Sequence, residues 1–131
     1  MNKSNIKGLA HIGVFVKDID KSIDFYKRLG FTLDKTEDIH VRLAFLSAGT
    51  CLVELVERKD IAARTHGIVD HFAMEVDDIE AAITRAKENG IDIDAATVGF
   101  ADILGGVKNV FFEGPDGERL EFFEYLVKGD K

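Results

Sequence analysis

The chain has 131 residues, of which 46% are apolar and 31% charged, and its formal net charge is −7. These values predict one globular domain over residues 1–131, or two small modules that share a core. No run of 18 apolar residues exists, which excludes a membrane-spanning helix, and the acidic balance without a basic block argues against nucleic acid as a partner. The single cysteine, Cys51, and the absence of a signal-peptide segment predict a cytoplasmic protein that binds a small molecule or another protein.

The first expected element is a strand in AHIGVFV, residues 10–16. Alternation places three branched apolar side chains on one face of this strand and His11 and Phe15 on the other. A helix follows, with Asp18 as its N-cap and Gly30 where a left-handed C-terminal cap is needed. Three further strands are expected at about residues 31–36, 40–47 and 50–57.

The same order of elements recurs in the second half of the chain. At an offset of 60 residues, His11 falls on His71 and Asp18 falls on Asp78. DHFAMEV therefore predicts another strand, and a second helix follows it. Three strands are then expected at about residues 92–97, 107–113 and 118–126. The second half also carries an insertion, AATVGFADILGG, whose glycines suggest a loop that could move.

Each half thus reads βαβββ, with module one at about residues 8–58 and module two at about 68–126. A four-stranded sheet with a single helix leaves one face to be covered, so two such sheets can pair. The sequence predicts an α+β fold in which two βαβββ modules form a cupped, mixed β-sheet.

Each module offers one histidine at its first strand and one glutamate in its last, on the faces expected to line the cup. Glu54 lies among apolar residues in TCLVELVE, and Glu121 does so in ERLEFFEY. An ionised carboxylate in such surroundings is costly to bury unless it is paired or bound to a cation. Together with His11 and His71, these carboxylates suit an octahedral divalent ion (Zn, Ni, Co, Mn or Fe) with two positions left for water or substrate. Hydrogen-bonded strand histidines and solvent-facing glutamates remain the alternative interpretation.

Other polar residues are expected to be structural. His40 and His66 have no counterpart in the other module and are expected in loops or at the surface. Cys51 lies on the strand face opposite Glu54 and is expected to be a small core residue. Glu75 shares the face of His71 but has no counterpart in the first module. The strand glutamates expected to face solvent are Glu57, Glu75, Glu113, Glu118 and Glu124.

Four stretches, LAHIGVFVKDIDKSIDFYKRLGF, CLVELVE, VDHFAMEVDDIEAAITRAKENG and VFFEGPDGERLEFFE, together resemble the vicinal oxygen chelate superfamily. Its members include glyoxalase I, methylmalonyl-CoA epimerase, extradiol dioxygenases, and the bleomycin and fosfomycin resistance proteins. The resemblance covers about residues 8–126. It implies paired βαβββ modules around a divalent metal, with Ni, Co or Zn favoured over Mn or Fe. The implied ligands are His11, Glu54, His71 and Glu121.

The full quartet resembles glyoxalase I and the epimerase more than the dioxygenases, which use two histidines and one carboxylate. The resemblance implies a lactoylglutathione lyase-like enzyme in which the metal stabilises an enediolate while a carboxylate moves the proton next to a carbonyl. Glu121 is the implied base, and Glu54 is the symmetry-related alternative. Phe15 and Arg58 replace the family's glutathione-contacting arginine and asparagine, so the exact substrate stays open.

Three alternatives to the lyase accompany the resemblance. They are an epimerase-like isomerase, for which Glu37 is the nearest match to an additional base, an Fe-dependent dioxygenase, and a non-catalytic binding or resistance protein. Many short family members exchange modules across a dimer. The resemblance therefore implies a homodimer with two sites, and it leaves open whether each site lies within one chain or is formed by His11 and Glu54 of one chain with His71 and Glu121 of the other.

Overall fold

The structure is a computed structural model that describes residues 9–61 and 69–127. His66 lies outside the described residues. The first module contains β1 (Ile12–Val16), α1 (Ile19–Leu29), β2 (Thr32–Asp38), β3 (Arg42–Ala48) and β4 (Cys51–Glu57). The second contains β5 (Phe72–Glu75), α2 (Ile79–Glu88), a 3-10 turn η1 (Ala95–Thr97), β6 (Gly99–Ala101), β7 (Val107–Glu113) and β8 (Arg119–Tyr125). No helix in these two ranges is long and apolar enough to cross a membrane.

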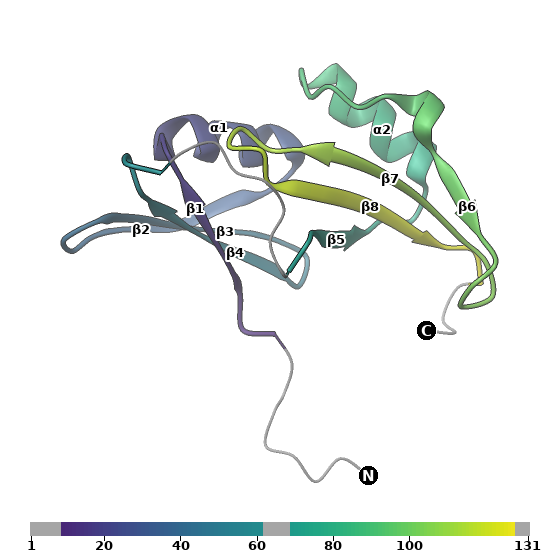
Figure 1. The fold of residues 1–131 in the computed structure, drawn as a ribbon, viewed down its shortest axis with the longest axis horizontal. Helices are drawn as coiled ribbons and strands as arrows, with labels where there is room; N and C mark the ends of the chain where they lie inside the picture. The colour runs from purple at the N-terminus through teal and green to yellow at the C-terminus, as the bar shows by residue number, and fades with distance from the viewer. Residues whose placement is uncertain (1–8, 62–68, 128–131) are drawn as a thin grey trace, which may run out of the picture.

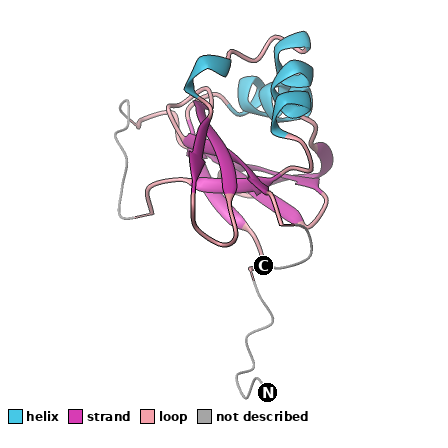
Figure 2. Ribbon diagram, turned by 90° about the vertical axis from the view of Figure 1, so that its right-hand side faces the viewer, coloured by secondary structure: helices cyan, strands magenta, loops and turns pink. Residues whose placement is uncertain are grey.

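Each module forms a four-stranded mixed sheet, in the orders β1-β4-β3-β2 and β5-β8-β7-β6. In both sheets the first strand runs parallel to the last, and the remaining neighbours are antiparallel. The two sheets lie next to each other (Figure 1), and both helices lie on the same side of them (Figure 2). The predicted α+β class with two βαβββ modules is therefore confirmed.

The helices begin and end as the sequence predicts. Asp18 caps α1 by accepting a hydrogen bond from the Lys21 amide at 3.2 Å, and Asp78 caps α2 by accepting one from the Ala81 amide at 3.1 Å. Gly30 ends α1 with a φ of 123°, a conformation that favours glycine because a side chain there would be strained. These caps fix where each helix lies relative to the strand that precedes it.

Two glutamates expected to face solvent support the helices instead. Glu57 Oε2 accepts from the Ile19 amide at 3.3 Å, and Glu124 Oε1 accepts from the Ile79 amide at 2.9 Å. Each carboxylate therefore satisfies the first free N–H of a helix, where the helix dipole favours negative charge. The solvent-facing prediction is wrong for Glu57 and Glu124, since single-strand alternation does not show that a helix start lies above that face.

Glu118 is a third exception, because it joins the two modules. Its Oε2 accepts from the Tyr26 hydroxyl at 2.9 Å, and its Oε1 accepts from the Asp116 amide at 2.9 Å. Tyr26 is completely buried. The Lys17 amide donates to Asp116 at 3.2 Å, so the β7–β8 turn packs on module one at two points.

Glu75 and Glu113 are exposed as predicted.

The prediction of a strand at residues 92–97 is wrong. Ile91 and Ile93 are buried in the core, but Asp94 then accepts from the Ala96 amide at 3.0 Å and starts the 3-10 turn η1. The edge strand of this sheet is instead β6, which lies inside the segment expected to be a mobile loop and pairs with β7. Ile91 and Ile93 alternate as in a strand because both side chains of this extended segment pack into the core. The hydrogen bond from the Ala96 amide to the Asp94 side chain then favours a turn over a continued strand.

Candidate metal centre

His11 and Glu54 lie together on one face of the first sheet. Gly13 of β1 lies opposite Glu54 of β4 in the parallel register, and the His11 Nε2 atom is 3.2 Å from Glu54 Oε1. A Cβ atom at Gly13 would lie 3.7 Å from that oxygen, which is an ordinary van der Waals contact, and Ala73 takes the equivalent place opposite Glu121 in the second module. Phe45 lies opposite Glu54 on β3 and meets the His11 ring edge-on, with 6.3 Å between centroids.

The second sheet repeats this arrangement with greater burial. His71 Nε2 lies 3.1 Å from Glu121 Oε1, and the Glu121 residue is 5% exposed. Phe111 lies opposite Glu121 on β7 and meets the His71 ring edge-on, with 5.2 Å between centroids. By comparison, the Glu54 side chain is 21% exposed. In each module, therefore, a histidine nitrogen faces a carboxylate oxygen, and one phenylalanine packs against the histidine ring.

Two further residues contact the second pair, and a third, Arg119, contacts one of them. The Asn109 side-chain amide donates to Glu121 Oε2 at 2.9 Å. Asp70 Oδ2 lies 2.8 Å from His71 Nδ1, and the same oxygen binds Arg119 Nη1. Strand alternation could have indicated Asn109 and Arg119, because they share a sheet face with Glu121. For Asp70, the sequence indicates a contact with His71 only through its position directly before that residue.

Within one chain, the structure brings the four predicted ligands together as two pairs and not as a quartet. In the described part of the chain, one group of three or more His, Cys, Asp or Glu residues has its ligand atoms within 4.8 Å of one another. This group consists of Asp78, Glu80 and Glu124. This acidic group surrounds the start of α2, where Asp78 and Glu124 cap the helix and Glu80 pairs with Lys108 at 3.3 Å. Its arrangement is accounted for by helix capping.

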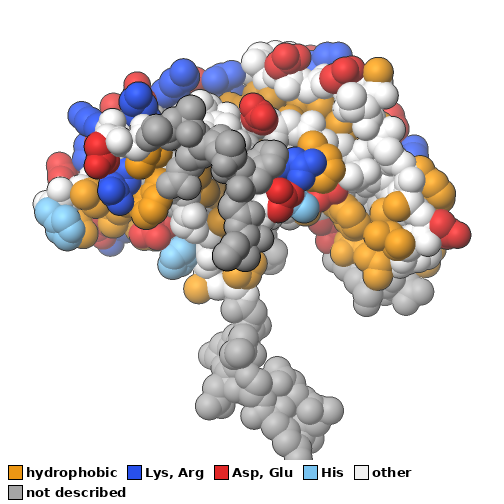
Figure 3. Space-filling view, viewed as in Figure 1, with side chains coloured by type: hydrophobic (Ala, Val, Ile, Leu, Met, Phe, Trp, Pro, Cys, Tyr) orange, Lys and Arg blue, Asp and Glu red, His pale blue; other side chains and the backbone are white. Residues whose placement is uncertain are grey.

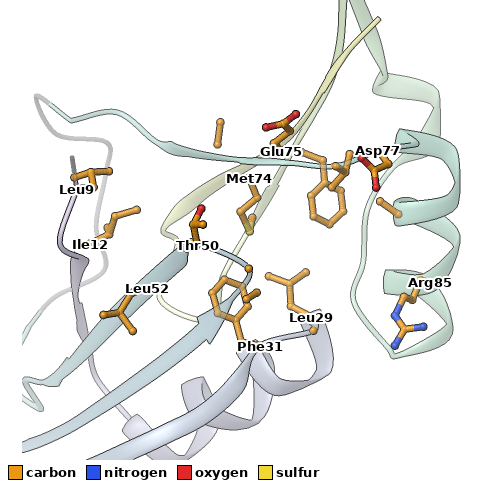
Figure 4. A pocket seen from close by; sticks show the side chains of 18 of the residues that line it. Leu9, Ile12, Leu29, Phe31, Thr50, Leu52, Met74, Glu75, Asp77 and Arg85 are labelled. Atoms are coloured by element: carbon orange, nitrogen blue, oxygen red, sulfur yellow. The ribbon is translucent and has the colours of Figure 1, made fainter. Parts of the chain in front are cut away.

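A cavity of about 1180 Å³ separates the modules, away from most of these ligands. It is lined by the start of β1, the β3–β4 turn and the end of α1 on one side, and by β5 and the start of α2 on the other (Figure 4). Of the four predicted ligands only His11 lines it. Most of the labelled side chains around it are apolar, and the charged ones come from module two: Glu75, Asp77 and Arg85.

Phe15 lies on the sheet face of module one that carries His11 and Glu54, and Arg58 lies over its ring. The Arg58 guanidinium carbon lies 5.2 Å from the centre of the Phe15 ring, and Arg58 also pairs with Asp60 at 3.5 Å. A cation held over an aromatic face is attracted by the ring. Glu37 is on the same sheet face, in register with Leu43, and pairs with Lys35 at 2.9 Å.

Cys51 is partly buried at the start of β4, so the prediction of a core residue holds only in part. It packs against the buried cluster and lines the cavity, and burial raises the pKa of its thiol above the usual value. A raised pKa reduces the thiolate fraction that a nucleophile or soft metal ligand needs.

Comparisons with known proteins agree with this architecture. The sequence profile of the Glyoxalase/Bleomycin resistance protein/Dioxygenase superfamily matches residues 8–122. The uncharacterized protein YwbC of Bacillus subtilis is 35% identical over 127 residues, covering 90% of this chain and 98% of YwbC. A lactoylglutathione lyase of Haemophilus influenzae is 31% identical over 126 residues, covering 88% of this chain and 91% of the lyase.

Solved structures show the same fold. A glyoxalase family protein from Enterococcus faecalis has a TM-score of 0.76 at 24% identity, covering 90% of this chain and 98% of that one. The fosfomycin resistance protein FosX of Listeria monocytogenes, complexed with Mn(II) and sulfate, has a TM-score of 0.69 at 15% identity. That match covers 94% of this chain and 96% of FosX.

Proposed function

Since the chain belongs to the Glyoxalase/Bleomycin resistance protein/Dioxygenase superfamily, we propose that it is a metal-dependent lyase or isomerase of the glyoxalase I type. The observation that carries this proposal is the repeated pair, in which a histidine Nε2 faces a glutamate Oε1 at 3.1–3.2 Å in each module. The similarity to a lactoylglutathione lyase supports the reaction class.

The donor set fits a divalent ion. Two imidazoles and two carboxylates are ligands that Ni, Co, Zn, Mn and Fe all accept, and we expect Ni, Co or Zn. Glu121 is buried beside apolar strand residues, and a buried carboxylate needs a compensating positive charge or donor. The proposed ligands are His11, Glu54, His71 and Glu121. A bound ion would supply Lewis-acid stabilisation for the negative charge that develops on a substrate carbonyl oxygen.

Glu121 is the proposed general base, which takes and returns the proton on the carbon next to that carbonyl. Asn109 donates to its Oε2, so this oxygen is held in place while Oε1 faces His71. A base held in one orientation loses little entropy when the substrate binds. Glu54, which is more exposed, is the symmetry-related alternative.

We propose that the substrate is a small molecule with an enolisable carbonyl. Phe15 with Arg58 above it offers an aromatic face and a positive charge on the ligand side of module one. These groups can contact the part of the substrate that does not react. The single cysteine, which is free, is in keeping with a cytoplasmic location.

A homodimer would complete the centre by bringing the His11–Glu54 pair of one copy to the His71–Glu121 pair of another. Two features of the described residues support this assembly. β1 pairs with β4 alone and β5 pairs with β8 alone, so each sheet has an unpaired edge beside its histidine. Leu9 and Val69, which precede these strands closely, are 83% and 82% exposed.

A second apolar surface is also available for assembly. Exposed apolar side chains gather at the end of module two that holds the β6–β7 turn and the end of β8 (Figure 3). They are Phe100, Ile103, Leu104, Leu126 and Val127. Contiguous exposed apolar surface commonly marks an interface.

Metal content tests the proposal directly. Protein purified without chelators is compared with His71→Ala and Glu121→Ala by elemental analysis, with the fold of each variant checked by circular dichroism. We expect bound divalent metal in the wild type and loss of it in both variants. Near-zero metal in all three, also after incubation with Ni, Co and Zn, would contradict the proposal. Hemithioacetal isomerisation, assayed with each metal, then tests the lyase reaction.

Mixing two inactive variants tests the shared centre. If the centres form between copies, His11→Ala and His71→Ala each lose both centres, whereas a mixed dimer keeps one. Unfolding and refolding an equal mixture should then recover about a quarter of the wild-type centres, by random pairing of two chains. Mixing two portions of His71→Ala is the control. No recovery, with mixed dimers demonstrated by mass, would place both pairs of each centre in one chain.

A further inference from the structure

We propose that Asp70, held in place by Arg119, is a positioning residue that orients His71 toward the metal. This inference rests on the proposed function, because it concerns the same centre. Asp70 lies just before β5 and its Oδ2 atom is 2.8 Å from His71 Nδ1. The opposite ring nitrogen, Nε2, is the one that faces Glu121. Asp70 thus contacts the ring on the side away from the proposed ion.

The contact places a hydrogen on Nδ1 of the imidazole, because an ionised carboxylate can only accept hydrogen bonds. Glu121 Oε1, 3.1 Å from Nε2, makes the same demand on the opposite nitrogen while no ion is bound. A metal that took the place of the hydrogen on Nε2 would bind the lone pair of that atom, while Asp70 keeps the other hydrogen on Nδ1. A carboxylate behind a metal-binding histidine commonly fixes the ring in this way and increases its basicity.

Asp70 is itself held from the other side. Its Oδ2 also binds Arg119 Nη1, and the Arg119 guanidinium carbon lies 3.8 Å from the centre of the Phe111 ring. Phe111 in turn contacts the edge of His71. The four side chains form a closed ring of contacts, His71 to Asp70 to Arg119 to Phe111 and back to His71. In such a ring, moving one member requires displacing two neighbours, so the imidazole is held in a single orientation.

The first module lacks this support. At the offset that relates the two histidines, Ala10 takes the place of Asp70. Two residues before Glu54 stands Leu52, where Arg119 stands two residues before Glu121. Neither alanine nor leucine has a side-chain hydrogen-bonding group. The repeat therefore preserves the proposed ligands and the framing phenylalanine, but only the second module has the aspartate and arginine.

Two measurable properties follow from this asymmetry. In the metal-free protein, Nδ1 of His71 should carry a hydrogen, and replacing Asp70 should shift the ring toward hydrogen on Nε2, which faces Glu121, without affecting His11. Loss of such a partner typically lowers metal affinity by about 10–100-fold. Asp70→Asn keeps an accepting oxygen but loses the charge, so it should fall between Asp70→Ala and the wild type.

The first experiment is nitrogen-15 NMR of the histidine rings in metal-free protein at about pH 8.5, where an ordinary imidazole is neutral. We expect a hydrogen on Nδ1 of His71 in the wild type and a shift to the Nε2–H form in Asp70→Ala, where the Glu121 contact remains. His11, recorded in the same spectra, is the internal control. An unchanged His71 ring in Asp70→Ala would overturn the proposal, and the thermal unfolding of both proteins shows whether the variant is folded.

The second experiment is a Co(II) titration followed by visible absorption, which reports affinity and coordination together. The matched control is Asp20→Ala, because Asp20 accepts from Arg42 at 2.8 and 3.1 Å on the surface of module one. We expect weaker binding and an altered spectrum for Asp70→Ala, partial recovery for Asp70→Asn, and wild-type behaviour for Asp20→Ala. Equal binding by wild type and Asp70→Ala would overturn the positioning role alone. Absence of Co(II) binding in the wild type would instead overturn the proposed function, and this inference with it.

Discussion

The Tyr26–Glu118 contact is a direct test of how the two modules hold together. Tyr26→Phe removes only the hydroxyl that donates to Glu118 at 2.9 Å, across the interface between α1 and the β7–β8 turn. The ring keeps its edge contacts with Phe25 and Phe31, at centroid distances of 5.1 and 5.4 Å. The change therefore leaves the packing of the core intact and isolates one hydrogen bond.

The magnitude follows from the charge and burial of the acceptor. A hydrogen bond to a charged group contributes about 1.5–3 kcal/mol, and in the variant the Glu118 carboxylate would still accept from the Asp116 amide. We expect Tyr26→Phe to lower the free energy of unfolding by about 1.5–3 kcal/mol. For a chain of this length the midpoint of thermal unfolding should fall by roughly 5–12 °C.

The assay is chemical and thermal denaturation at one fixed protein concentration, because assembly would otherwise shift the midpoint. A double-mutant cycle with Glu118→Gln supplies the control, since the same hydroxyl then donates to a neutral amide oxygen and its removal should cost less. A change below about 0.5 kcal/mol for Tyr26→Phe in the wild-type background would refute the reasoning.

Four further outcomes are expected. Burial raises the pKa of the Glu118 carboxyl, so its contribution to stability is present below the usual carboxyl pKa and is lost as pH rises through the raised value. Wild type should therefore lose stability relative to Glu118→Gln as pH rises above the usual carboxyl pKa, and parallel pH profiles by urea denaturation would contradict this. Gly114→Ala should destabilise the protein in a thermal melt, because its Cβ would lie within van der Waals overlap of the Glu118 side chain. Asp18→Ala and Asp78→Ala should each lower the free energy of unfolding by about 1 kcal/mol through loss of a helix cap, with smaller changes expected for Asp18→Asn and Asp78→Asn. A metal at about 100 times its dissociation constant should add about 2.7 kcal/mol to the free energy of unfolding, an increase that EDTA should reverse and His71→Ala should lack.

Repetition and strand alternation made most of the fold predictable. The 60-residue offset pairs His11 with His71 and Asp18 with Asp78, and the structure gives these pairs equivalent places in two βαβββ modules. Period-two patterns also place each histidine on the face of its glutamate, because in the parallel register β1 lies beside β4 and β5 lies beside β8. That the four residues bind a metal stays a prediction.

What the sequence did not reveal depends on partners that lie elsewhere in the fold. Glu57, Glu118 and Glu124 appear as ordinary strand glutamates until α1 and α2 supply their N–H and O–H donors. The position of β6 was missed because local side-chain capping by Asp94 outweighs an alternating apolar pattern. Arg119 and Asn109 required knowing which strands are neighbours before their contacts with Asp70 and Glu121 could be inferred.

The last strand of each module has a property that reaches beyond stability. Glu54 and Glu57 are three residues apart, as are Glu121 and Glu124, so the members of each pair point to opposite faces of their strand. One member faces the neighbouring histidine and the other accepts the first amide of the helix. A strand that slipped by one residue would lose both contacts at once, so the register that seats the helix also places the other glutamate beside its histidine. The positions of Glu54 and Glu121 are therefore fixed by the same strand register that docks α1 and α2.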